Sequence, residues 1–310
     1  MNGAERFPTL LAPELMARVR SIQIRTHRLV SEVLQGAYRS NVRGTGIEFD
    51  AVRPYLVGDD VRRIDWKVTA RTGDPFIKTF VEERSLLIEL VVDTSLSMDF
   101  GSAEKTKREV AAEIAALLSF VASGAQDQVG LQLFSDGPGL RLAPNKGNRH
   151  VLRVVREVVA APPRGRSSVL GAVIEEELRL LKRRSLLFLI SDFLGLGEGT
   201  WEGPLARLAR RHDVIAVRIF DPLEEELPRA GRILLREIEG GNEVEIDTRS
   251  RALREQWSSA ARERWMRLQR TFRRAQIDAI DVSTASDVAE PLVRLFQQRS
   301  RGRRLTGAVR

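Results

Sequence analysis

The sequence predicts an α/β fold with a doubly wound, mostly parallel sheet, preceded by a small β-rich subdomain and a helical arm. From residue 86 onward, apolar runs of strand length alternate with segments that have the spacing of amphipathic helices. Strands that alternate with helices form mostly parallel sheets covered on both faces. Two of the runs, at residues 86–92 and 186–190, end directly in loops that contain Asp and Ser. In such folds, ligands bind beyond the carboxyl ends of the strands.

The composition suits one large α/β domain with an appended subdomain. The chain has 310 residues, and 43% of them are hydrophobic, which is enough for a core and argues against global disorder. Cysteine is absent, so disulfides and thiolate metal sites are excluded. Because the chain has only three histidines, we expect any bound metal to be held mainly by oxygen atoms.

Four regions are expected along the chain. A helical arm is predicted at residues 1–35, where apolar residues recur at helical spacing. Residues 36–84 contain glycines and prolines between short runs, which indicates a β-rich subdomain of hairpins and loops. The α/β domain is expected at residues 85–298. A basic tail follows at residues 299–310, of a kind that is commonly disordered.

Within the α/β domain, the pattern predicts each element in order. Strands are expected at residues 86–92, 129–134, 186–190, 214–220 and 277–282, with a short antiparallel strand after a turn at residues 137–139. Helices are expected at residues 103–123, 151–159, 169–181, 204–211 and 288–296. Ser102 is the expected N-cap of the first helix. A hairpin at residues 233–246 precedes a long amphipathic helix that contains Trp257 and Trp265.

Features of the surface predict a cytoplasmic protein. The apolar runs are too short to cross a membrane, and the N-terminus is too charged for a signal peptide. The formal net charge of +8 at pH 7 raises nucleic acid or an acidic membrane surface as partners. Since most of the arginines alternate with glutamates on the expected helix faces, a solvated surface is the favoured interpretation.

One carboxylate and two hydroxyls directly follow the strand at residues 86–92, namely Asp93, Ser95 and Ser97. Because they alternate along one loop, they can turn toward one point and offer the oxygen ligands that Mg²⁺ prefers. The strand at residues 186–190 is followed by Asp192, which a parallel sheet places at the same edge as Asp93. The pattern therefore predicts a Mg²⁺ or Mn²⁺ site at this edge.

A third hydroxyl for this site comes from the loop that precedes the helix expected at residues 169–181. Ser167 is the candidate ligand, and the neighbouring Ser168 is the alternative. A helix N-cap is the other interpretation of Ser167. For the remaining site residues, capping and loop hydrogen bonds are the simpler alternative to metal binding.

The order of these residues resembles the metal-ion-dependent adhesion site of von Willebrand factor type A domains, which has Asp-x-Ser-x-Ser, a later Thr and a later Asp. Asp93, Ser95 and Ser97 match the first element, and Asp192 matches the last. Ser167 stands where the family has Thr. The resemblance implies a divalent metal whose coordination is completed by a carboxylate of a partner protein.

A second block resembles the domain of unknown function 58 family, in which it directly precedes a type A domain. The block contains Gly44-Thr45-Gly46, Arg53-Pro54-Tyr55, Gly58-Asp59-Asp60, Ile64-Asp65-Trp66-Lys67 and Ala70-Arg71. The two resemblances together cover roughly residues 15–300. They imply a non-enzymatic adaptor or co-chaperone that works with a MoxR-type AAA+ ATPase on a client protein, and that has no small-molecule substrate.

Two other classes of function stay open. One is a metal-dependent phosphatase or hydrolase that uses Asp93. Aspartyl phosphatases of the haloacid-dehalogenase kind need a second Asp two residues later, where this chain has Ser95, and no Gly-x-Ser-x-Gly sequence of a serine hydrolase occurs. The other is an Arg-rich nucleic-acid-binding protein, which would need aromatic residues interleaved with the basic ones, and aromatics make up only 6% of the chain.

Overall fold

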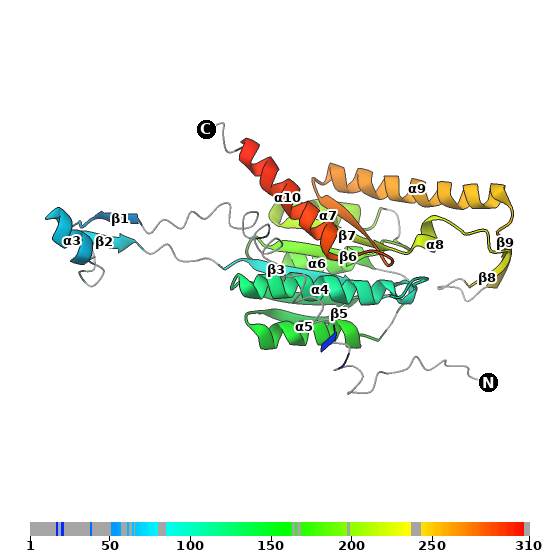
Figure 1. Cartoon of the computed structure of the whole chain (residues 1–310), viewed down its shortest axis with the longest axis horizontal. Helices are drawn as coiled ribbons and strands as arrows, with labels where there is room; N and C mark the ends of the chain where they lie inside the picture. Colours follow the sequence, from blue (N-terminus) through cyan, green and yellow to red (C-terminus); the bar gives the residue numbers. More distant parts are fainter. Residues whose placement is uncertain are drawn as a thin grey trace.

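The structure, a computed structural model, describes most of the chain from residue 51 onward (Figure 1). The described ranges are 51–56, 66–79, 85–162, 169–196, 199–236 and 243–306, together with the single residues Ala17, Arg20, Ser21, Tyr38, Val61, Ile64 and Gly165. Most of the expected arm at residues 1–35 and part of the block at residues 44–71 therefore lie outside the described residues.

Six strands form the central sheet in the order β10-β7-β6-β3-β4-β5 (Figure 1). Their bounds are β3 (Leu87–Asp93), β4 (Gln128–Phe134), β5 (Pro138–Asn145), β6 (Leu186–Ser191), β7 (Asp213–Phe220) and β10 (Asp278–Ser283). All neighbouring pairs are parallel except β4 and β5, which are antiparallel at one edge. The chain enters this sheet at the interior strand β3, and the later strands are added outward on both sides of it. The predicted doubly wound, mostly parallel α/β fold is confirmed.

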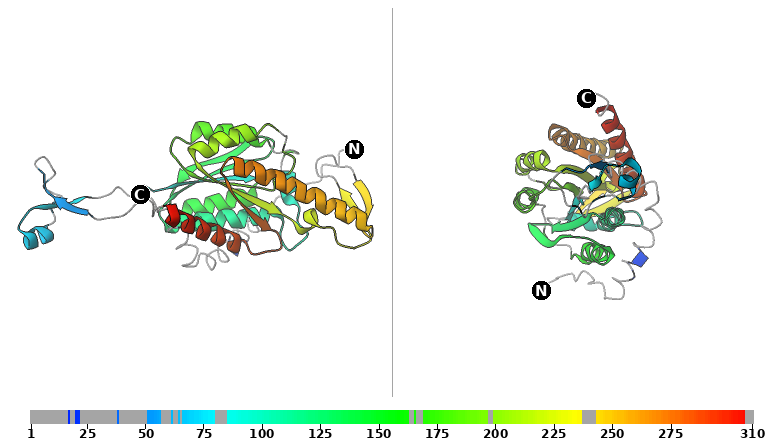
Figure 2. Two further views of the ribbon diagram at one scale, coloured as in Figure 1. Left: turned by 90° about the horizontal axis from the view of Figure 1, so that it is seen from above. Right: turned by 90° about the vertical axis from the view of Figure 1, so that its left-hand side faces the viewer.

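Helices cover both faces of the sheet (Figure 2). Side chains alternate along a strand, so Leu90 and Val92 of β3 pack into one core cluster while Val91 packs into the other. The first cluster includes residues of α4 (Lys107–Gly124), α5 (Asn148–Ala160) and α10 (Ala289–Thr306). The second includes residues of α6 (Leu170–Leu180), α7 (Glu202–Arg211) and α9 (Arg251–Arg274). No helix in the described ranges has both the length and the apolar character that a membrane span requires.

Helix α4 begins at Lys107, four residues later than the sequence pattern predicts. Its N-cap is Thr106, whose side chain accepts a hydrogen bond from the backbone N–H of Glu109, while the Glu109 carboxylate accepts one from the backbone N–H of Thr106. The expectation that Ser102 is the N-cap is wrong. Ser102 instead donates from its backbone N–H and its hydroxyl to Asp221, at 2.7 and 2.5 Å.

We expect Thr106→Ala to lower the free energy of unfolding by about 1 kcal/mol, because the first turn of α4 loses a hydrogen-bond acceptor. Urea denaturation followed by circular dichroism measures the change. Thr106→Ser keeps the hydroxyl and is the matched control, with an expected change of a few tenths of a kcal/mol. Equal losses in the two variants would contradict the capping role.

The segment between β7 and β10 consists of α8 (Pro222–Glu225), β8 (Arg232–Arg236), β9 (Glu243–Asp247) and α9. Strands β8 and β9 pair antiparallel, as the predicted hairpin requires, and α9 is the predicted long amphipathic helix. Helix α10 continues to Thr306, so this part of the expected tail is helical rather than disordered. Arg299 of α10 donates to Asp213 and Asp278 at 2.6 and 2.5 Å, which fixes the helix to β7 and β10.

A small unit precedes the sheet and contains β1 (Ala51–Pro54), α3 (Trp66–Thr72) and β2 (Phe76–Thr79). The two strands pair antiparallel, from Ala51 opposite Thr79 to Pro54 opposite Phe76. The sequence predicts only hairpins and loops in this region, and helix α3 corrects that expectation.

Candidate functional site at the carboxyl edge of the sheet

The carboxyl ends of β3 and β6 lie side by side. The two strands run parallel with Val92 opposite Ile190, so Asp93 and Ser191 follow at adjacent positions. Asp192 is the next residue after β6. The structure thus brings Asp93 and Asp192 to the same edge of the sheet, where sequence reasoning expects them.

The loop after β3 folds back onto Asp93. The Oδ1 atom of Asp93 accepts a hydrogen bond from the backbone N–H of Ser95 at 2.9 Å, and Oδ2 accepts one from the hydroxyl of Ser191 at 2.7 Å. A short 3-10 helix, η2 (Leu96–Asp99), begins directly after Ser95. It brings the Ser97 hydroxyl to 3.1 Å from the Ser95 hydroxyl. One carboxylate and two hydroxyls therefore form a compact group of oxygen atoms.

Burial changes the acidity of Asp93, which has no exposed surface. Loss of solvation and the nearby charge of Asp192 raise the pKa of Asp93 to about 6, while hydrogen bonds from Ser191 and Ser95 act in the opposite direction. Asp93 is accordingly ionised at neutral pH, but burial and the charge of Asp192 disfavour this form, and a nearby cation would stabilise it.

Asp192 is paired with a buried lysine. The Nζ atom of Lys107, whose side chain is 0% exposed, donates to Asp192 Oδ2 at 2.6 Å and to Glu224 Oε1 at 2.5 Å. The remaining oxygen of Asp192 accepts a hydrogen bond from the backbone N–H of Leu194 at 3.0 Å. Burial acts against the charged form of Lys107, but Asp192 and Glu224 outweigh it and raise the pKa of the lysine above its usual value. The lysine is a fixed positive charge.

Asp221 holds α8 in the place where Glu224 reaches this lysine. It is fully buried, caps α8 by accepting a hydrogen bond from the backbone N–H of Leu223 at 2.9 Å, and accepts another from the Thr284 hydroxyl at 2.7 Å. Burial acts to raise the pKa of Asp221, but hydrogen bonds from Ser102, Thr284 and Leu223 together lower it. Asp221 is therefore a structural anion rather than a free ligand.

The structure brings together four of the five residues that the sequence singles out: Asp93, Ser95, Ser97 and Asp192. Ser167 and its alternative Ser168 lie outside the described residues. Sequence reasoning missed Ser191, Lys107 and Glu224. The Ser191-Asp192 pair at the end of a strand was a signal for the first of these, whereas nothing local indicates the other two.

The donor set fits a small, hard cation. All of its atoms are oxygens, and the hydroxyls of Ser95 and Ser97 would be the neutral ligands beside the Asp93 carboxylate. Across the described ranges, no three His, Cys, Asp or Glu side chains gather as a metal-binding group, so a cation at this edge would need hydroxyl ligands as well. Asp93, Ser95 and Ser97 are the residues that would hold such an ion.

Fold and site define a class of protein: a doubly wound α/β domain with a buried site of carboxylates and hydroxyls at the carboxyl ends of adjacent strands. A family model described as "Protein of unknown function DUF58" matches residues 51–267. The chain belongs to this family, which confirms the relationship that the block at residues 44–71 predicts.

The chain is similar to uncharacterized proteins of mycobacteria and to several solved structures. The uncharacterized proteins Rv1480 of Mycobacterium tuberculosis and Mb1516 of Mycobacterium bovis are each 34% identical to this chain over 294 residues, which are 94% of this chain and 91% of the relative. The hypothetical protein BatB from Bacteroides thetaiotaomicron is 13% identical, with a TM-score of 0.45 over 70% of this chain and 100% of that chain. The SpRpn10 VWA domain is 13% identical, with a TM-score of 0.37 over 68% and 95%.

Proposed function

We propose that the chain is a non-enzymatic, metal-dependent protein-binding module that acts as an adaptor or co-chaperone with a MoxR-type AAA+ ATPase. Asp93, Ser95 and Ser97 would hold Mg²⁺ or Mn²⁺, with Asp192 beside them and Ser167 as a further ligand. The ion would supply an open coordination position for a carboxylate of the partner or client protein. The ATPase as partner rests on the resemblance of the block at residues 44–71.

The buried charge at the carboxyl edge is the observation that carries the proposal. Asp93 has no exposed surface, and burial together with the charge of Asp192 raises its pKa to about 6, so its ionised form is costly there. A divalent cation beside Asp93 would stabilise the ionised form, and the hydroxyls of Ser95 and Ser97, which lie 3.1 Å apart, are placed to share its coordination.

The position of the described histidines supports a binding role rather than catalysis. His150 lies within 2.8 Å of the backbone oxygen of Val129, and His212 directly precedes β7. His150 of α5 therefore lies beside the amino end of β4, and His212 lies beside that of β7, at the opposite edge of the sheet from Asp93. In the described part of the chain, no imidazole stands beside Ser95, Ser97 or Ser191 to act as a general base.

The first test measures metal binding directly. Mg²⁺ added to metal-free protein is expected to stabilise it by about 2.7 kcal/mol at a concentration 100 times the Kd. Differential scanning fluorimetry with Mg²⁺ and Mn²⁺ follows this effect, and Asp93→Ala is expected to abolish it. Asp136→Asn removes one negative charge from an exposed residue just beyond β4, at the same edge of the sheet, and is expected to keep the response.

The second test measures partner binding. A purified MoxR-type ATPase is expected to be retained by the wild-type chain in Mg²⁺, and to be lost with EDTA or with Asp93→Ala. Equal retention of the ATPase by the wild type and by Asp93→Ala would contradict the metal-dependent mechanism. Hydrolysis of p-nitrophenyl phosphate that needs Mg²⁺ and disappears in Asp93→Asn would show an enzyme instead.

A further inference from the structure

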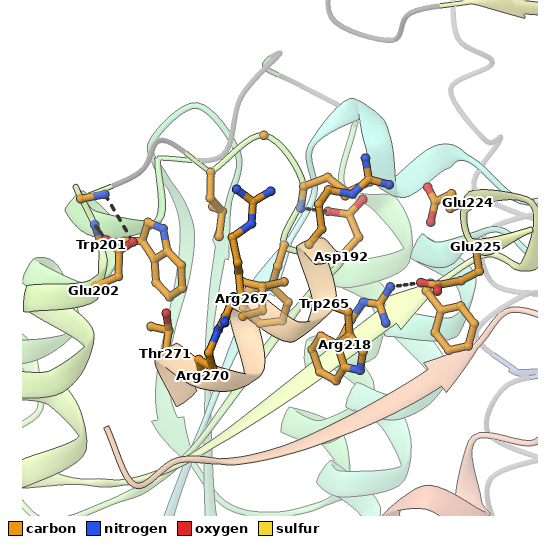
Figure 3. A pocket seen from close by; sticks show the side chains of 18 of the residues that line it. Asp192, Trp201, Glu202, Arg218, Glu224, Glu225, Trp265, Arg267, Arg270 and Thr271 are labelled. Carbon is orange, nitrogen blue, oxygen red and sulfur yellow. Dashed lines mark hydrogen bonds and ion pairs between the residues drawn. The ribbon is translucent and has the colours of Figure 1, made fainter. Parts of the chain in front are cut away.

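A pocket of about 590 Å³ lies beside the candidate metal site (Figure 3). Asp192 stands at its rim, and its walls come from the loop after β6, from β7 and α8, and from one side of α9. Phe193 and Trp201 are each 4% exposed and pack against Phe272 beneath them. The pocket is therefore a preformed, partly aromatic cavity of a size that binds ligands in other proteins.

Helix α9 lines this pocket with four arginines, which we call the arginine track: Arg264, Arg267, Arg270 and Arg274. Their spacing of three and four residues places them along one face of the helix. All four are exposed, and Arg267 rises from α9 between Trp201 and Asp192 in Figure 3. At a rise of 1.5 Å per residue, the track is about 15 Å long.

The acidic side chains that line the pocket among the described residues already have hydrogen-bond or ion-pair partners outside the track. Asp192 and Glu224 pair with Lys107, and Glu225 pairs with Arg218. The Glu202 carboxylate accepts hydrogen bonds from the backbone N–H groups of Gly199 and Trp201, each at 3.3 Å. By contrast, Arg264, Arg270 and Arg274 form no ion pair with any residue in the described ranges.

Arg218 belongs to the wall of the pocket and not to the track. Its guanidinium lies between two rings, 5.0 Å from the centroid of Phe220 and 4.6 Å from that of Trp265. It also pairs with Glu225, as Figure 3 shows. This stack holds Trp265 in place, so that the pocket presents an apolar ring beside the positive charges of α9.

We propose that the pocket and the arginine track bind an extended, acidic segment of a protein partner. The arginines spread along about 15 Å of helix, which is too far for them to converge on one phosphate group. An extended peptide of about five residues has this length. Its alternate side chains point to opposite sides, so acidic residues would face the arginines of α9 while the apolar ones between them would face the aromatic wall that includes Trp201.

This inference rests on the proposed function only in naming a protein as the occupant, because the track itself needs no metal. The segment would lie next to Asp192, so the same partner could place one carboxylate at the metal site and further ones along α9.

A labelled peptide tests the proposal. The probe is fluorescein-Glu-Leu-Glu-Phe-Glu, and its binding to the full chain is measured by fluorescence anisotropy in EDTA. The double variant Arg264→Glu/Arg270→Glu is expected to weaken binding by at least about tenfold. The matched control Arg262→Glu/Arg273→Glu changes two exposed arginines of α9 that do not line the pocket, and is expected to change the affinity less than about twofold.

Each outcome of this experiment either supports or contradicts the proposal. Equal weakening by the two double variants would mean attraction to the overall positive charge, and would overturn the site. Equal binding of a peptide with Gln in place of Glu, or tighter Arg264-dependent binding of an oligothymidylate than of the peptide, would overturn the acidic protein segment. If Asp93→Ala loses the metal response but keeps peptide binding, the two sites are separate. If metal binding fails altogether and the peptide still binds, only the proposed function falls.

Discussion

Lys107→Met is expected to lower the free energy of unfolding by about 3–5 kcal/mol, the typical loss when one partner of a buried ion pair is removed. Methionine preserves most of the length of the side chain and its packing, so the change isolates the charge. Without the ammonium group, Asp192 and Glu224 face each other in a region where the Asp192 side chain is only 1% exposed. Asp93 lies close enough for Asp192 to raise its pKa, so the local repulsion extends to a third carboxylate.

Lys105→Met is the matched control for this prediction. Lys105 also forms an ion pair with a carboxylate, at 2.6 Å from Glu113, but its own side chain is 22% exposed. Partly exposed pairs of this kind contribute about 0–1 kcal/mol. Urea denaturation of both variants at pH 7 gives the comparison, and similar losses in the two would show that Lys107 has no special role at the site.

Sequence periodicity is sufficient to predict the central sheet and the long helices that cover its two faces. Strands covered on both faces are almost continuously apolar, and β3 and β6 stand out for that reason. The start of α4 shows the limit of the method. Ser102 is an acceptable N-cap by residue type, yet its hydroxyl bonds to Asp221, 119 residues away, and Thr106 with Glu109 takes the capping role. A contact over such a distance leaves no mark on the local pattern.

The residues of the candidate site also fall into two groups, those that the local sequence predicts and those that only long-range packing brings there. Asp93, Ser95, Ser97 and Asp192 follow strands directly, so the sequence places them once the sheet is known to be parallel. Lys107 is different, because lysine is rarely buried and a positive charge is unfavourable in the first turn of a helix. Its partners are 85 and 117 residues further along the chain. Only the packing of α4 and α8 against the edge of the sheet brings the three together.

A second buried group of charges lies on β3, away from the candidate site. Glu89 is fully buried in the middle of the strand, opposite Gly130 of β4, where any side chain would collide with the glutamate. It lies 3.5 Å from Arg141 but accepts no hydrogen bond from a described residue, since Arg141 donates to Glu177 instead. Burial, together with the charge of Glu177, raises the pKa of Glu89 to about 8, although Arg141 acts in the opposite direction.

This raised pKa predicts how stability depends on pH. Below about pH 4.5, Glu89 is protonated in both the folded and the unfolded chain and has no effect. Between about pH 4.5 and 8 the unfolded chain ionises while the folded one stays protonated, so stability falls, and above about pH 8 it falls no further. A shift of this size corresponds to a loss on the order of 5 kcal/mol.

Glu89→Gln is expected to remove that loss. Glutamine resembles the protonated glutamate and cannot ionise, so the variant gains stability relative to the wild type as the pH rises from 5 to 8.5. Any cost of burying an amide without hydrogen bonds is the same at both pH values and cancels in the comparison. Urea denaturation of both proteins at pH 5 and pH 8.5 gives the four free energies, and parallel curves would mean that Glu89 is already ionised in the folded chain. Glu177→Gln separates the causes, since it releases Arg141 to pair with Glu89 and is expected to reduce the pH dependence by lowering the pKa of Glu89.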